Sequence, residues 1–187
     1  GQKVAARAAA GLKPAVLELG GSDPCIVLND ADVQKACDVI TLSRMINAGQ
    51  SCIAAKRVIV EAGVYDDVCR ELTERFDALE LGDPSQENQC IGPIAREDLR
   101  DKLHSQVMRS IQDGAECLTG GEKPDMPGFF YPPTLLAGVT SEMAVFREET
   151  FGPVLAVCKA ANLDEALVIA NDTEYGLGSS IWTGSDT

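Results

Sequence analysis

Cys52 is the residue best placed to act as a sulfur nucleophile. It follows residues 47–51 (NAGQS), in which Gly49 permits a sharp backbone turn after a helical pattern. Such a turn can leave the next side chain and its own N–H facing a cavity, where the N–H can bind an oxyanion. Three other cysteines lie within or beside apolar patterns and are interpreted as packing residues: Cys25, Cys37 and Cys69.

Glu18 is the second candidate. The other residues of its segment, 15–19, are Ala, Val and Leu, a pattern that predicts a short buried strand. A carboxylate placed there must be paired, protonated or functional. It could activate water as a general base, which is the help that a thioester intermediate needs in order to hydrolyse. The alternative is an edge position from which the side chain reaches water.

The third candidate cluster is residues 147–153 (REETFGP), in which carboxylates and an aromatic ring precede a rigid Gly-Pro turn. Carboxylates at a strand entry of an α/β domain can accept hydrogen bonds from ribose hydroxyls. A surface salt bridge from Arg147 is the alternative. The residues alone favour neither interpretation.

The composition excludes several classes of protein. A formal net charge of -13 opposes binding to nucleic acid, and no apolar run approaches the ~20 residues that span a bilayer. We therefore expect neither a nucleic-acid nor a membrane partner.

The cysteines and the single histidine limit the chemistry further. Seven cysteines, an odd number, include no CxxC pair and no zinc spacing, which predicts a reducing, cytoplasmic location and no metal site. The one histidine, His104, could serve Cys52 as the base of a cofactor-independent hydrolase or acyl-transfer enzyme. Its place in a polar helix without an acidic partner disfavours that function.

The elements that must position these residues alternate along the chain. Helices are predicted over residues 1–10, from Asp30 or Asp32 to 46, 64–79, 97–113 and 163–170. Strands are predicted over residues 15–19, 57–60, 115–118, 134–136, 154–158 and 179–183. The order predicts an α/β fold with an open, mostly parallel sheet and flanking helices.

Three motifs together resemble the NAD(P)-dependent aldehyde dehydrogenase superfamily. They are residues 17–21 (LELGG), 47–52 (NAGQSC) and 148–153 (EETFGP), separated by 34 residues from Glu18 to Cys52 and by 97 from Cys52 to Glu149. The likeness extends over essentially the whole chain and includes the tail 171–177 (NDTEYGL).

The resemblance implies a role for each matched residue. Cys52 would attack the aldehyde, a hydride would pass to the nicotinamide of NAD or NADP, and Glu18 would activate the water that hydrolyses the thioester. Glu149 would hold the nicotinamide ribose with Phe151 near the ring, and Gly1 and Leu19 would also lie at the cofactor. Family members that transfer the acyl group to coenzyme A typically lack the base at Glu18, so water is the expected acceptor.

The resemblance also implies a fragment. Residues 1–20 would be the tail end of the cofactor-binding domain, and residues 21–187 a catalytic domain truncated at its C-terminal end. The isolated chain is expected to be inactive and to bind NAD poorly, whereas the full-length protein would form a homo-oligomer. A catalytically silent relative is a third possibility, which the intact Cys52, Glu18 and Glu149 disfavour.

The sequences of residues 19–24 (LGGSDP) and 54–57 (AAKR) look closest to those of bacterial succinate-semialdehyde dehydrogenases. Some family members with that activity bind the substrate carboxylate with an arginine six residues before the cysteine. This chain has Ile46 there and Arg44 two residues earlier. Ile46 equally suits an apolar aldehyde, so succinate semialdehyde or a related small aldehyde is expected.

Overall fold

The computed structural model describes residues 1–85 and 91–185. Its helices are α1 (Gln2–Ala10), α2 (Val33–Met45), α3 (Tyr65–Asp77), α4 (Glu97–Gln112), α5 (Ala144–Arg147) and α6 (Leu163–Asn171), with a 3-10 turn, η1 (Ile46–Gly49). Its strands are β1 (Asp23–Val27), β2 (Ala55–Glu61), β3 (Glu116–Thr119), β4 (Thr134–Ala137), β5 (Val154–Ala160) and β6 (Ser180–Trp182). Cys90 lies outside the described residues.

The strands form a single sheet in the order β3-β4-β5-β2-β1-β6. All neighbouring strands are parallel except β3, which runs antiparallel to β4 at one edge. The predicted open, mostly parallel sheet is confirmed.

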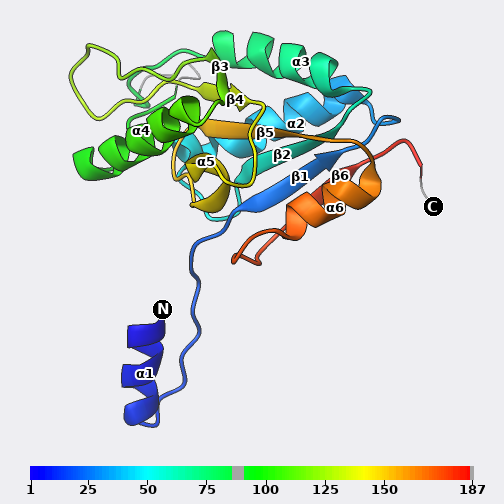
Figure 1. Ribbon diagram of the computed structural model, residues 1–187. Coiled ribbons are helices and arrows are strands. Elements are labelled where there is room, and N and C mark those ends of the chain that lie inside the picture. Colours follow the sequence, from blue (N-terminus) through cyan, green and yellow to red (C-terminus); the bar gives the residue numbers. More distant parts are fainter. Residues whose placement is uncertain (86–90, 186–187) are drawn as a thin grey trace.

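Helices cover both faces of this sheet (Figure 1). Alternate residues of β2 point to opposite sides: Val58 and Val60 join the core beneath α2 and α3, and Ile59 joins the core beneath α4, α5 and α6. Because both faces are covered, the central strands are apolar almost throughout, as parallel strands usually are.

The predicted helices follow from their capping residues and apolar spacing. Asp32 begins α2 by accepting a hydrogen bond from the Lys35 N–H at 3.1 Å, and α3 and α4 carry acidic residues in their first turns. Cys37 and Cys69 point into the core from α2 and α3, and Cys25 from β1, which confirms the packing role assigned to all three.

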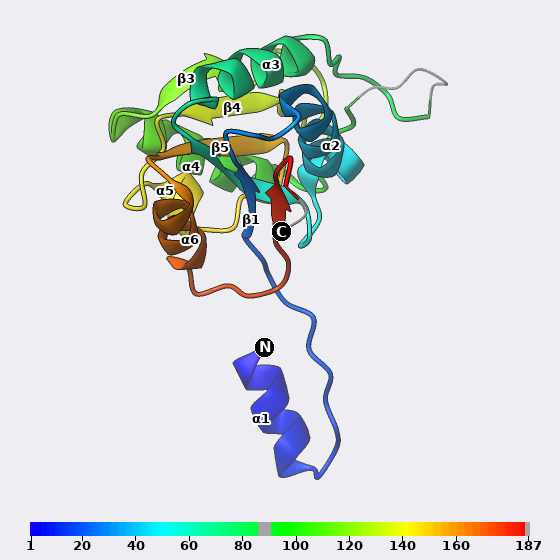
Figure 2. The same ribbon diagram turned by 90° about the vertical axis from the view of Figure 1, so that its right-hand side faces the viewer.

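The strand predicted over residues 15–19 is wrong. That segment is extended, exposed and unpaired, and the strand instead forms at β1, a few residues later. Figure 2 shows α1 and the segment after it standing away from the sheet. Val16 is 94% exposed there, because no strand or helix among residues 1–85 and 91–185 offers it an apolar surface.

Within the described ranges, no helix is long and apolar enough to cross a membrane.

Candidate active site

The candidate residues gather at one edge of the sheet. Cys52 lies just before β2, Glu149 and Phe151 before β5, and Gly21 before β1. Because these three strands are parallel neighbours, their amino ends meet at the same edge. The topology thus brings together residues 97 positions apart in the chain.

The turn that carries Cys52 has an unusual backbone. Asn47, Ala48 and Gly49 have φ values of 54°, 52° and 74°, so three consecutive residues are left-handed. A Cβ atom at Gly49 would collide with the carbonyl group of Gly152. The Cys52 turn and the Gly-Pro turn of residues 152–153 therefore fit together only because position 49 is glycine.

Gln50 braces the same turn, a role that the sequence analysis missed. Its Nε2 donates to the carbonyl oxygens of Asn47 at 3.1 Å and Pro93 at 3.4 Å, and its Oε1 accepts from the Ala95 N–H at 2.8 Å. The turn is thereby tied to the segment before α4.

Cys52 is a half-buried free thiol, and its backbone N–H has no acceptor among the described residues. Cys37 and Cys158 lie in the core, where burial raises the pKa of each thiol to about 12, so both stay protonated. The Cys52 side chain and N–H are therefore the pair in this region that remains available to an incoming carbonyl group.

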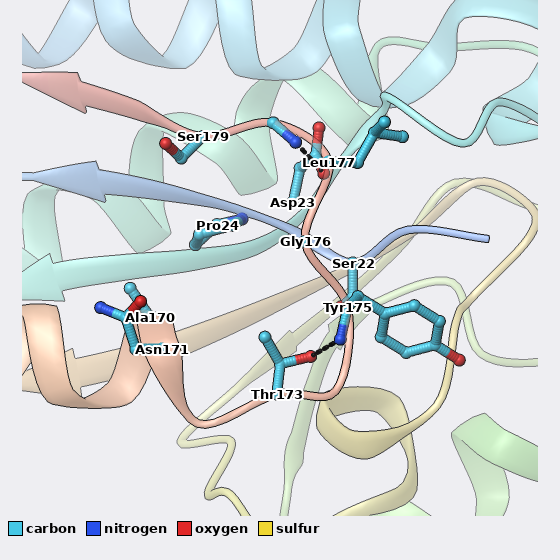
Figure 3. A pocket seen from close by; sticks show the side chains of 11 residues that line it. Ser22, Asp23, Pro24, Ala170, Asn171, Thr173, Tyr175, Gly176, Leu177 and Ser179 are labelled. Atoms are coloured by element: carbon cyan, nitrogen blue, oxygen red, sulfur yellow. Dashed lines mark hydrogen bonds between the residues drawn. The ribbon is translucent and has the colours of Figure 1, made fainter. Parts of the chain in front are cut away.

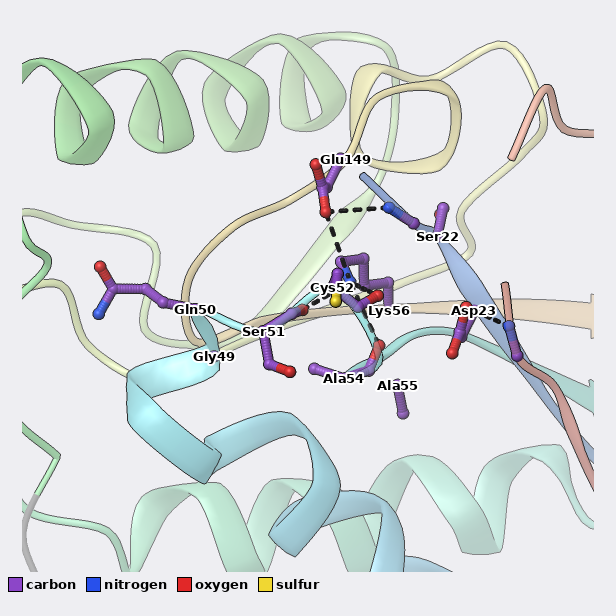
Figure 4. A network of polar contacts seen from close by, with 12 residues as sticks. Ser22, Asp23, Gly49, Gln50, Ser51, Cys52, Ala54, Ala55, Lys56 and Glu149 are labelled. Atoms are coloured by element: carbon purple, nitrogen blue, oxygen red, sulfur yellow. Dashed lines mark hydrogen bonds and ion pairs between the residues drawn. The ribbon is translucent and has the colours of Figure 1, made fainter. Parts of the chain in front are cut away.

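Glu149 is directed into the site by two partners. Its Oε1 accepts from the Gly21 N–H at 3.1 Å and lies 3.9 Å from Lys56 Nζ (Figure 4). The alternative for this cluster was a surface salt bridge from Arg147. Arg147 pairs with Asp172 at 2.7 Å and not with Glu149. Glu149 and Phe151 instead line one cavity, together with Leu99, Lys102, Leu103 and Gln106 of α4.

The neighbouring glutamate, Glu148, is bound to α4 and does not line this cavity. It accepts from Gln106 Nε2 at 2.9 Å and from Arg109 at 2.8 Å, which ties the segment before β5 to α4. Adjacent carboxylates thus divide their roles between anchoring the backbone and facing the cavity.

Two buried cations at the start of β2 were also missed. Lys56 and Arg57 are fully buried although they carry charge. Arg57 donates to the Ser22 carbonyl oxygen at 2.8 Å and the Ala170 carbonyl oxygen at 3.1 Å, and its guanidinium lies 4.8 Å from the centre of the Phe146 ring. The available signal was a pair of charges directly before the apolar residues 58–60 of the same strand.

A second hollow adjoins the site beside the start of β1 (Figure 3). Asp23 Oδ1 accepts from the Gly178 N–H at 3.0 Å, and Thr173 Oγ1 accepts from the Tyr175 N–H at 3.2 Å. These contacts hold residues 173–178, most of the tail that resembles the family, across the amino end of β1.

Glu18 is placed differently from expectation. It is exposed and lies outside any strand, so the idea of a carboxylate buried in a strand is wrong. It lines a shallow hollow with Leu19, Gly20, Glu174 and Tyr175. Leu19 in turn contacts Gly1, where an added Cβ would lie 2.6 Å from Leu19 Cδ1, so the structure brings those two predicted cofactor residues together.

The remaining alternatives gain no support from the geometry. His104 Nδ1 lies 3.2 Å from the Tyr131 hydroxyl, and no hydrogen bond of the described chain joins His104 to Cys52. Across residues 1–85 and 91–185, no group of three or more His, Cys, Asp or Glu side chains could hold a metal ion.

Comparisons with known proteins agree on one family. The model of the aldehyde dehydrogenase family matches residues 1–187. A succinate semialdehyde dehydrogenase of Escherichia coli K12, named for NAD(P)+, is 49% identical over all of this chain and 40% of its own length. A succinate-semialdehyde dehydrogenase of Mycobacterium tuberculosis H37Rv, named for NADP+, is 48% identical over all of this chain and 41% of its own length.

Solved structures give the same result. Lactaldehyde dehydrogenase from Escherichia coli superposes with a TM-score of 0.95 at 41% identity, over all of this chain and 39% of the other. An aldehyde dehydrogenase of Mycobacterium tuberculosis in complex with NAD+ gives 0.94 at 38% identity, over 99% and 39% of the two chains. The chain spans about two fifths of the length of the curated relatives it matches. With the family model matched from end to end, this chain belongs to the aldehyde dehydrogenase family.

Proposed function

We propose that the complete protein oxidises a small aldehyde to a carboxylic acid with NAD+ or NADP+, using Cys52 as the nucleophile. The observation that carries this proposal is the meeting of the Cys52 turn with the Glu149 segment at one sheet edge, through Gly49 against Gly152 and Lys56 beside Glu149. The names of the relatives from Escherichia coli and Mycobacterium tuberculosis support the reaction class.

Cys52 performs the covalent steps. Its sulfur attacks the aldehyde carbon, and the resulting oxyanion accepts a hydrogen bond from the free Cys52 N–H. Loss of hydride from that carbon leaves a thioester on Cys52. Water then attacks the thioester, which releases the acid and returns the thiol.

Glu149 and Phe151 are the residues of this chain proposed to hold the cofactor. Their shared cavity and the half-buried Glu149 carboxylate suit a ribose hydroxyl beside a flat ring. When bound, the nicotinamide supplies the hydride acceptor. Gly1 and Leu19 are assigned to the same cofactor from the family resemblance, and they lie against each other where the start of α1 meets the last residues of the 1–20 segment.

Glu18 is proposed to take the proton of the attacking water. In the structure Glu18 belongs to the exposed segment before β1, two residues from Gly20, whose Cα is packed against Glu149. This connection supports the assignment, because it ties the end of the segment to the same edge of the sheet as Cys52.

Single-turnover kinetics of the complete protein test both assignments. Cys52→Ala should abolish hydride transfer, with Cys117→Ala as a thiol control that stays active. Glu18→Gln should give a burst of reduced cofactor followed by slow thioester hydrolysis, at least about 100-fold below the unmodified rate. Glu174→Gln is the matched control, since Glu174 lines the same hollow. A normal steady-state rate in Glu18→Gln would remove its role as general base.

Succinate semialdehyde is the proposed substrate, on the strength of the relatives' names. Arg44 does not reach an incoming carboxylate, because it is completely buried and donates to the Gly49 carbonyl oxygen. Ile46 is 55% exposed and leaves room for an apolar aldehyde. A panel of aldehydes decides: faster turnover of hexanal than of succinate semialdehyde would overturn this choice.

The complete protein is proposed to be a cytoplasmic homo-oligomer with a domain boundary near residue 20. The six cysteines in the described ranges are free thiols, which supports a reducing cytoplasm. The separation of residues 1–20 from the sheet supports a domain boundary near residue 20. A homo-oligomer is proposed from the family resemblance, and light scattering of the complete protein measures it.

A further inference from the structure

Lys56 lies directly behind the Cys52 turn. Its fully buried Nζ donates to the carbonyl oxygens of Ser51 at 2.9 Å, Cys52 at 2.9 Å and Ala54 at 3.4 Å (Figure 4). Three donors on one ammonium group match three acceptors on one turn. The hydrogen bonds are satisfied, and the positive charge is held in place beside the nucleophile.

One of these bonds reaches the proposed oxyanion donor through the backbone. The Ser51 carbonyl and the Cys52 N–H belong to the same peptide unit, and in a trans peptide the two groups point in opposite directions. Lys56, by holding the Ser51 oxygen, therefore directs the Cys52 N–H away from the core. A charged donor on the oxygen also polarises the peptide unit and strengthens its N–H as a donor.

The charges around Lys56 are unbalanced. Arg44 is also completely buried, donates to the Gly49 carbonyl oxygen, and has no partner for its Nε and Nη1 among the described residues. The near carboxylate, Glu149, lies 3.9 Å from Lys56 and is partly exposed, while Asp23 is engaged by the Gly178 N–H. Two buried cations thus face one close carboxylate.

The titration of Lys56 is consistent with this surplus. Burial, and then the charge of Arg44, lowers the pKa of Lys56 to about 8. Glu149, then Asp23 and Cys52, act in the opposite direction and only partly offset this lowering. Its positive charge is present at neutral pH and is lost as the pH rises through about 8.

We propose that Lys56 is a positioning residue for the Cys52 reaction, which orients the Cys52 N–H and, with Arg44 behind it, stabilises the negative charge that the sulfur and its aldehyde adduct carry. The inference rests on the proposed function of Cys52. Packing alone does not require a charge at this position, because a neutral side chain of similar length would fill the same space. The charge of Lys56 is therefore assigned to the reaction of Cys52.

The test is alkylation of the complete protein with iodoacetamide from about pH 6 to about pH 10, read for each cysteine by mass spectrometry. In Lys56→Met, the midpoint of the Cys52 profile should move up by about one pH unit, so that alkylation at pH 7 slows about tenfold. Lys56→Gln should behave similarly, and Lys35→Met, which removes an exposed charge on α2, should change nothing. Cys117, which is half-buried on β3, is the internal reference and should keep its profile.

Folding is checked in the same samples, because Cys25, Cys37 and Cys158 are buried and react only if the variant opens. An unchanged Cys52 profile in either folded variant overturns the inference. If both variants expose the buried cysteines, the unmodified protein decides, with glutathione alkylated in the same samples as the free-thiol reference: a Cys52 midpoint no lower than that of glutathione overturns the inference, and a lower one supports it. Full activity of Cys52→Ala would instead overturn the proposed function, whatever the alkylation shows.

Discussion

The Cys52 turn and the segment that carries Glu18 are built in opposite ways. The turn is fixed by Gly49 against Gly152, by the amide of Gln50 and by the ammonium of Lys56. The Glu18 segment is exposed, belongs to no strand and follows a helix, α1, that buries no residue. The proposed nucleophile is thus positioned by this chain's own core, whereas the proposed base depends on surfaces that its own sheet does not provide.

This difference between the two regions corresponds to the two parts of the proposed function, attack by sulfur and activation of water. Attack by sulfur needs a fixed thiol and a fixed N–H, which the sheet edge supplies. Activation of water needs a carboxylate brought to that edge, and its segment gains little stability from the packing of the sheet. Substitutions in the two regions should therefore differ sharply in their effect on the free energy of unfolding.

Gly49→Ala should lower the free energy of unfolding most, by about 3 kcal/mol. The backbone at position 49 is left-handed, which disfavours alanine, and the added Cβ would collide with Gly152. Urea unfolding of this 187-residue chain, followed by circular dichroism, measures it. Gly138→Ala is the matched control, since Gly138 has φ 63° and open space around its Cβ position, and should cost only about 1 kcal/mol. Equal costs at the two glycines would show that the contact with Gly152 does not fix the turn.

Gln50→Ala should destabilise the protein by about 1 kcal/mol through the loss of its bonds to Asn47, Pro93 and Ala95. The same unfolding measurement applies. Gln2→Ala in α1 serves as the control and should leave the free energy of unfolding within about 0.5 kcal/mol of the unmodified value. A larger cost at Gln2 than at Gln50 would reverse the contrast between the two regions.

In this 187-residue chain, Val16→Ser should have the smallest effect, below about 0.5 kcal/mol, because Val16 is 94% exposed in the same segment as Glu18. Val27→Ser, at a fully buried valine of β1, should cost about 2 kcal/mol or more. A cost at Val16 comparable with that at Val27 would mean that residues 15–19 pack against the sheet after all.

The same contrast marks how far the sequence predicts the fold. The helices over residues 33–45, 65–77 and 97–112 were predicted because their apolar spacing and caps are local signals. Strand β1 was missed because Asp23 and Pro24 resemble a turn and leave only three apolar residues. The apolar residues of segment 15–19 predict a strand, yet composition does not say whether a partner surface exists.

The candidate site was predicted in part for a similar reason. Cys52 and Glu149 stand in motifs with recognisable order, and parallel pairing of β2 with β5 brings them to one edge. The charges of Lys56 and Arg57 stand out in an apolar strand, but their burial, and the bonds of Arg57 and Gln50 to distant segments, are not encoded in any local pattern. Their roles follow from the three-dimensional arrangement of the strands and helices.

The contact between Gly49 and Gly152 has a consequence for protein engineering. A designer who grafted the six residues of the NAGQSC turn onto another parallel sheet would leave Gly49 facing whatever backbone entered the adjacent strand. The smallest transferable unit is therefore two separate segments on neighbouring strands, copied together with their register.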